Sequence, residues 1–202
     1  MAKAQSQRRN GKAQKGFTTV ELMVSLGVMV VIAAIAVPSL LQGWNSYRLT
    51  SAAGNIAGLL ERARFEAIRR NTRIACIGAP QANGFAIWID LNGNGALDPG
   101  EPEVIFNGAA VPMAAGTAPG PASMGAAYAN AIVPPGPATQ YGSVSFNARG
   151  TTVTAAGLTA PYYVVYLGMT NQPTYGYRAV TITPMGQVKT WFAQANGAWV
   201  AQ

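Results

Sequence analysis

The chain has 202 residues, of which 50% are apolar types and 10% are charged. This length suits one folded domain with a terminal extension, and the composition is not that of a disordered polar chain. Histidine is absent and Cys76 is the single cysteine. The sequence therefore excludes Ser-His-Asp and Cys-His catalysis, zinc sites that use imidazole, an internal disulfide and any Cys-x-x-Cys motif.

The net charge of +7 comes mainly from the N-terminus. The first sixteen residues hold five of the 14 basic residues and none of the 7 acidic ones, which leaves a net charge of only +2 (9 against 7) for the rest of the chain. A basic tail directly before an apolar run predicts that the tail stays on the cytoplasmic side of a membrane. We interpret the basic balance as a topology signal, and it says little about nucleic-acid binding.

Residues 17–41 form the apolar run, which contains one charged residue, Glu21. A helix of this length covers about 37 Å, enough to cross a hydrocarbon core of about 30 Å. Three interpretations fit this pattern. The run is a secretory signal cut after the motif Ala34-Ile35-Ala36, a permanent membrane anchor, or a segment that stays in the membrane temporarily.

Glu21 favours the third interpretation. A carboxylate in a spanning helix costs about 2.5–3.5 kcal/mol at the bilayer centre, and a simple signal or anchor gains nothing from it. A positively charged partner would offset that cost. Cleavage after Gly16 would create such a partner, a new amino terminus at Phe17, four residues away on the same helical face.

The basic leader, Lys15-Gly16, Phe17, Glu21 as fifth residue after the cut and the apolar helix together resemble the class III signal of type IV pilins and type II secretion pseudopilins. Pro38 stands where that family often has a helix-kinking proline. The resemblance implies a leader over 1–16, which a prepilin peptidase removes before it N-methylates Phe17. It also implies that the apolar helices later leave the bilayer for a filament core, where Glu21 neutralises the amino terminus of a neighbouring subunit.

The helical pattern continues over residues 42–72. Apolar residues recur there at steps of three and four, which is typical of an amphipathic helix that faces a core. These residues are Leu49, Ala52, Ala53, Ile56, Leu59, Leu60, Ala63, Ala67 and Ile68. The spacings Glu61–Arg64 and Glu66–Arg70 allow ion pairs on the other face. We expect the helix to end near Asn71.

From residue 73 onward the hydrophobic period changes toward two, which predicts strands. We expect strands at 73–77, 85–90, 103–106, 143–147, 162–167, 178–183 and 187–192. The Gln81–Gly84 segment predicts a hairpin turn, and the Ala-, Gly- and Pro-rich residues 108–140 predict one long irregular loop. The fold class is therefore α+β, with a long N-terminal helix packed on a mainly antiparallel β domain over 73–202.

The order of the segments after the helix resembles the GspH/FimT group of minor pilins and pseudopilins. This resemblance implies a structural subunit that is incorporated into, or primes, a type IV pilus or a type II secretion pseudopilus. The implied partners are other pilin subunits, the prepilin peptidase and an inner-membrane assembly platform. The implied location is the inner membrane, crossed once, with the N-terminus cytoplasmic and the C-terminal domain periplasmic, and later the filament.

A DNA-binding minor pilin that acts in DNA uptake is the alternative function. Many members of the group have a Gly-Arg-x-Arg motif near the C-terminus, where this chain has Gly186-Gln187-Val188-Lys189. Only Lys189 keeps a basic residue, which puts a DNA-binding role in doubt. The arginines at 62, 64, 69, 70 and 73 form either a phosphate-binding patch or a solvated helix face.

The segment from residue 90 to 101 matches the template of a calcium loop, with oxygen donors and a glycine at the required spacing. The predicted ligands are Asp90, Asn92, Asn94, Ala96 (through its carbonyl), Asp98 and Glu101. A strand precedes the loop and prolines follow, so its flanks are not those of an EF-hand. The alternative is a turn in which asparagine and glycine only supply positive φ angles.

No catalytic constellation stands out in the sequence, and we expect no enzyme activity. Cys76 lies in an apolar strand, where we expect a small buried side chain. We also expect the aromatic residues of the strands to belong mainly to the core.

Overall fold

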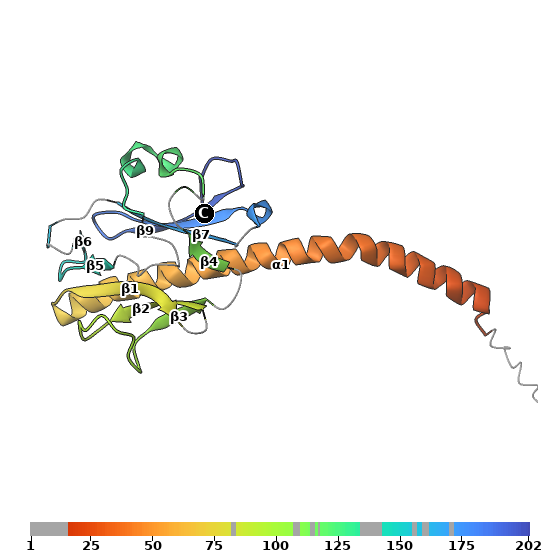
Figure 1. Cartoon of the computed structure of the whole chain (residues 1–202), viewed down its shortest axis with the longest axis horizontal. Coiled ribbons are helices and arrows are strands. Elements are labelled where there is room, and N and C mark those ends of the chain that lie inside the picture. Colours follow the sequence, from red (N-terminus) through yellow and green to blue (C-terminus); the bar gives the residue numbers. More distant parts are fainter. Residues whose placement is uncertain are drawn as a thin grey trace, which may run out of the picture. The chain divides into compact units, whose positions relative to one another are not determined.

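The computed structural model describes residues 16–81, 84–106, 110–113, 116, 118–133, 143–154, 157–158, 162–169 and 172–202 (Figure 1). The predictions about leader residues 1–15 and about the turn residues Ala82 and Asn83 lie outside this part of the chain. The chain divides into two compact units between Leu41 and Gln42.

Helix α1 (Thr19–Arg70) begins in the first unit and ends in the second. In the first unit every described side chain is exposed. The helix is long and apolar enough to cross a membrane, and its most apolar 18-residue stretch has a mean hydropathy of 2.6. Asn71, at the predicted helix end, has a φ of 49°, and the N–H of Thr72 donates to the carbonyl of Ala67 at 3.1 Å. A left-handed asparagine of this kind terminates a helix.

The second unit contains two five-stranded sheets. The first sheet has the order β3 (Glu103–Phe106), β2 (Gly84–Asp90), β1 (Ile74–Gln81), β5 (Val144–Phe146), β6 (Thr152–Val153). The second has the order β10 (Val200–Ala201), β9 (Val188–Ala193), β8 (Tyr177–Ile182), β7 (Tyr163–Met169), β4 (Ala110–Met113). All strand pairs within the sheets are antiparallel, which confirms the predicted α+β class.

The core lies where the amphipathic half of α1 meets the inner faces of both sheets (Figure 1). Ile56 and Leu60 of the helix are almost completely buried there, together with Phe146 of β5 and Val180 of β8. The helix stripe read from the sequence is buried as predicted, except for Ile68, which is 44% exposed.

The prediction of one irregular loop over 108–140 is wrong in two places. Residues of β4 pair with β7, from Ala110↔Met169 to Met113↔Tyr166, and Pro121–Met124 and Ala126–Tyr128 form short 3₁₀ turns, η1 and η2. Their side chains Met124 and Tyr128 are buried in an aromatic cluster on the outer face of the second sheet. Composition could not reveal this, because tertiary packing and not local periodicity orders the segment. Residues 134–140 lie outside the described part.

Candidate functional site

The predicted processing and assembly residues lie at the start of α1. Gly16 and Phe17 precede the helix, and Phe17 is 81% exposed. The hydroxyl of Thr18 accepts the N–H of Glu21 at 3.2 Å, and the Glu21 carboxylate accepts the N–H of Thr18 at 3.2 Å. This reciprocal pair is a capping box, a motif that closes helix N-termini. Glu21 therefore has a local structural role that its charge alone does not reveal.

Pro38 lies inside α1. Proline has no N–H, so the carbonyl of Ala34 loses its helical partner at this point. The roles predicted for Gly16, Phe17, Glu21 and Pro38 in processing and assembly stay predictions.

The segment predicted to bind calcium forms a loop that is held together by its own hydrogen bonds. The Asp90 carboxylate is buried and accepts the N–H groups of Gly93 at 2.7 Å and Gly95 at 2.9 Å. The Glu101 carboxylate accepts the N–H groups of Leu91 at 2.8 Å and Asp98 at 3.2 Å. These bonds fix the loop because the donors are backbone groups that need partners.

The remaining predicted ligands point toward one another. The amide nitrogens of Asn92 and Asn94 donate to one oxygen of Asp98, at 2.7 and 2.6 Å. The amide oxygen of Asn94 accepts the N–H of Ala96 at 2.8 Å. Within the described residues, no three acidic, cysteine or histidine side chains converge on one centre. A bound cation would compete with these hydrogen bonds for the oxygens of Asp90, Asp98 and Glu101.

Calcium binding stays a prediction with a simple test. If the loop binds calcium at about 10⁻⁴–10⁻³ M, as extracellular modules do, about 5 mM calcium stabilises the domain by about 1–2 kcal/mol. We expect the fragment from Gln42 onward to melt a few degrees higher in calcium than in chelator, and magnesium to have much less effect. Coincident melting curves in calcium and chelator would make the loop a turn only.

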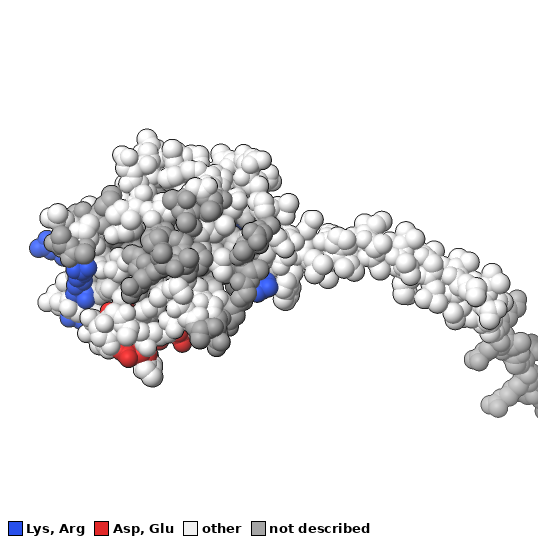
Figure 2. Space-filling view, viewed as in Figure 1, with Lys and Arg blue, Asp and Glu red and all other residues white. Residues whose placement is uncertain are grey.

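Basic side chains gather at the end of the domain where α1 ends (Figure 2). One Glu66 oxygen lies 2.6 Å from Arg69 and 2.9 Å from Arg70, and the hydrogen bonds from Arg69 and then Arg70 lower the pKa of that carboxyl. The predicted partner of Glu61, Arg64, instead donates to the carbonyl of Gly150 at 3.0 Å. Arg73 donates to the hydroxyl of Ser145 at 3.0 Å, so four of the five arginines in question have partners within the domain.

Lys189 lies on β9 opposite Thr181 and is exposed. DNA binding through Lys189 stays a prediction.

Arg178 is a structural residue that the sequence does not single out, because it stands in an ordinary strand pattern. It is only 3% exposed, and burial lowers the pKa of its guanidinium. Its Nε donates to the hydroxyl of Thr50 at 3.0 Å, its Nη2 donates to the hydroxyl of Ser46 at 2.9 Å, and it lies 4.4 Å above the Phe192 ring. Arg178 thus joins α1 to the second sheet.

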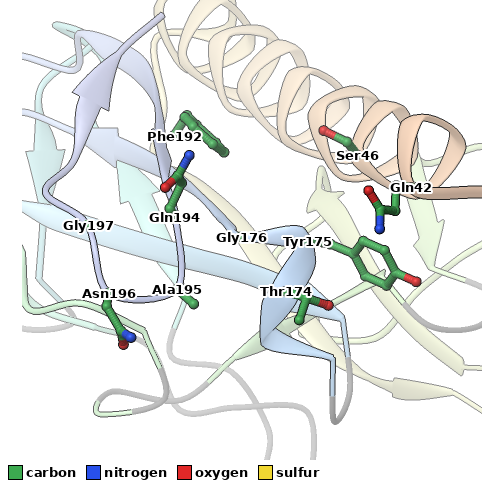
Figure 3. A pocket seen from close by; sticks show the side chains of 10 residues that line it. All are labelled: Gln42, Ser46, Thr174, Tyr175, Gly176, Phe192, Gln194, Ala195, Asn196 and Gly197. Atoms are coloured by element: carbon green, nitrogen blue, oxygen red, sulfur yellow. The ribbon is translucent and has the colours of Figure 1, made fainter. Parts of the chain in front are cut away.

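An open groove of about 630 Å³ lies beside this arginine, between α1, the turn at Thr174–Gly176 and the turn that follows β9 (Figure 3). Figure 3 shows Gln42 and Tyr175 on one side of the groove and Gln194 on the other. None of its lining side chains is a carboxylate, thiol or amine. The groove offers amides, hydroxyls and aromatic surface.

Cys76 is 4% exposed, which confirms the prediction of a buried side chain. Burial raises the pKa of its thiol to about 12, so almost no thiolate forms at pH 8. We expect iodoacetamide to leave the folded protein unmodified and to label Cys76 fully in urea, as measured by intact mass. Rapid labelling of the folded protein would show that the thiol is accessible.

Comparison with known proteins defines the class. Residues 52–186 match the family model described as "Type II transport protein GspH". The chain is 37% identical over 89 residues to the pilin-like protein PilA1 of Thermus thermophilus, an alignment that covers 44% of this chain and 56% of that protein. The chain therefore matches little more than half the length of this curated relative. The crystal structure of the type IV minor pilin FimU of Pseudomonas aeruginosa aligns with a TM-score of 0.45 at 18% identity, over 75% of this chain and 92% of that chain.

The chain combines an exposed apolar helix with a helix-and-sheet domain that matches the GspH family model. The family match spans most of the domain, and the chain belongs to the GspH family of pilin-like proteins. The matched range ends at Gly186, so Lys189 lies beyond it.

Proposed function

We propose that this chain is a minor pilin or pseudopilin, a structural subunit that is incorporated into, or primes, a type IV pilus or a type II secretion pseudopilus. The observation that carries the proposal is the combination of the GspH match with an apolar helix that is exposed along its whole length over residues 19–41. An apolar face of this size needs a lipid or protein environment, because it is unfavourable in water. A membrane provides that environment before assembly, and neighbouring helices provide it in a filament.

The same proposal includes the route to the filament. The basic leader stays in the cytoplasm, the helix crosses the inner membrane once, and the domain from Gln42 onward lies in the periplasm. A prepilin peptidase cuts between Gly16 and Phe17 and methylates the new amino terminus. An inner-membrane platform then moves the subunit into the filament, where it contacts other pilin subunits.

Processing tests this proposal directly. We expect the protein extracted from the envelope to begin at Phe17 with one added methyl group, as measured by intact mass. Gly16→Val puts a bulky side chain at the cut and should leave only uncut precursor in the membrane. Gly11→Val makes the same substitution earlier in the leader and should be processed normally. A mature protein that begins at Val37 would contradict the proposal and indicate an ordinary secretory signal.

A further inference from the structure

Strand β3 forms one edge of the first sheet, and half of its backbone groups point away from the sheet. The carbonyl of Pro102 accepts the N–H of Ile89 on β2 at 2.9 Å. Because the direction of backbone groups alternates along a strand, Val104 and Phe106 also face β2, whereas Glu103 and Ile105 direct their N–H and C=O groups outward. Among the described residues, β2 is the only strand that pairs with β3. The outward groups are therefore ready to pair with an added strand.

A groove runs along this edge, between β3 and α1. It consists of two adjoining hollows of about 220 and 560 Å³, which share Asn55, Val104 and Ile105. On the helix side, Gly54 and Gly58 stand one turn apart, and a Cβ on either would meet nothing within 4 Å. The groove therefore has room for the side chains of an incoming strand on the side that faces α1.

Exposed apolar groups flank the groove. Ile105 is 49% exposed on the edge strand, and Tyr47, which lines the smaller hollow, is 68% exposed. Trp44 lies one turn before Tyr47 on the helix, is 63% exposed, and its ring centroid is 6.5 Å from that of Tyr47. Exposed apolar groups clustered beside unpaired backbone are typical of an interaction site.

The other edges of the two sheets are less suited to strand addition. The N–H of Thr152 on β6 already donates to the carbonyl of Pro184 at 3.0 Å. Strand β4 contains Pro112, which has no N–H, and β10 has only two residues. Among the edge strands of the two sheets, β3 is therefore the one best suited to pair with an added strand.

We propose that β3 is a docking strand for an extended segment of a neighbouring pilin subunit, which adds to the sheet beside Glu103 and Ile105. This inference rests on the proposed function. Cross-strand neighbours prefer opposite charge and matched apolar surface. The incoming segment therefore has Lys or Arg beside Glu103 and an apolar residue beside Ile105, and its groove-facing side chains lie against Gly54 and Gly58.

The outward direction of the Ile105 N–H allows a sharp test. Ile105→Pro deletes an N–H that β2 does not use, so the ladder between β2 and β3 stays intact, and proline is tolerated on edge strands. Ile105→Ala removes the exposed side chain but keeps the N–H. We expect the amount of full-length Ile105→Pro protein in sheared filaments to be at least about tenfold lower than that of wild type. The amount of Ile105→Ala protein should stay within about twofold of wild type. Both variants should melt close to wild type.

A photo-crosslinking amino acid in place of Glu103 provides a second measurement, which holds even if Ile105→Pro folds poorly. We expect adducts in isolated filaments between this position and a peptide of another pilin subunit, identified by mass spectrometry. Normal incorporation of Ile105→Pro, or filaments that contain the chain without any pilin adduct at 103, would overturn the docking strand and leave the proposed function standing. Absence of the wild-type chain from filaments would overturn both.

Discussion

Gly186→Ala is expected to destabilise the domain by about 2–5 kcal/mol, a large part of the stability of a domain of this size. Gly186 has a φ of +74°, in the left-handed region, and its N–H donates to the carbonyl of Thr183 at 2.8 Å in the turn before β9. An added Cβ would collide with the carbonyl oxygen of Gly150 and lie 2.9 Å from Nε of Arg64. That oxygen accepts the hydrogen bond from Arg64, so neither group can move without breaking a contact.

Gly93→Ala is the matched control. Gly93 has a φ of +77°, and its N–H is also hydrogen-bonded in a turn, but a Cβ there would meet nothing within 4 Å. We expect Gly93→Ala to lower the free energy of unfolding by only about 1–2 kcal/mol, because alanine is disfavoured in the left-handed backbone conformation. Urea unfolding of the fragment from Gln42 onward measures both values. If Gly186→Ala and Gly93→Ala lower the free energy of unfolding equally, the added Cβ at Gly186 does not collide with the Gly150 carbonyl. The positive φ and the close approach to Gly150 explain why a glycine stands at the start of the Gly-Gln-Val-Lys segment.

Glu21→Ala is expected to lower the amount of the chain in filaments at least about tenfold and to leave the melting of the domain unchanged. In a filament core, the carboxylate would face the amino terminus of a neighbouring Phe17, and removal of one partner leaves an unpaired charge in a medium of low dielectric constant. Immunodetection in sheared filaments, with the fragment from Gln42 onward as the stability control, measures the two effects separately.

The capping box makes it possible to distinguish charge from helix capping. Glu21→Gln keeps an acceptor for the N–H of Thr18 but removes the charge, whereas Thr18→Val removes the cap and keeps the charge. We expect Glu21→Gln to fail in assembly like Glu21→Ala, and Thr18→Val to assemble. If Glu21→Gln assembles normally and Thr18→Val does not, Glu21 acts by capping the helix and not by its charge.

The sequence by itself was enough to predict the long helix, most of the strands and the buried positions of the core. These features repeat along the chain: the stripe from Leu49 to Ala67 has the period of a helix, and the central strands β2, β7 and β8 are mostly apolar. Local patterns of this kind persist in the fold because burial of apolar surface stabilises the matching secondary structure. The apolar helix over residues 17–41 can be read in the same way, whereas the capping role of Thr18 and Glu21 was not predicted and comes from the structure.

Only the tertiary structure decided which distant segments meet. Strands β6 and β10 have two residues each, too few to show a period, and β4 is ordered by its pairing with β7. Arg178 donates hydrogen bonds to Ser46 and Thr50, which lie more than a hundred residues earlier in the chain. Gly150, Gly186 and Arg64 likewise pack against one another from three distant segments. The free edge of β3 likewise depends on where the sheet ends. Contacts between segments far apart in sequence leave no periodic trace, because they follow from how the sheets and the helix pack and not from local preference.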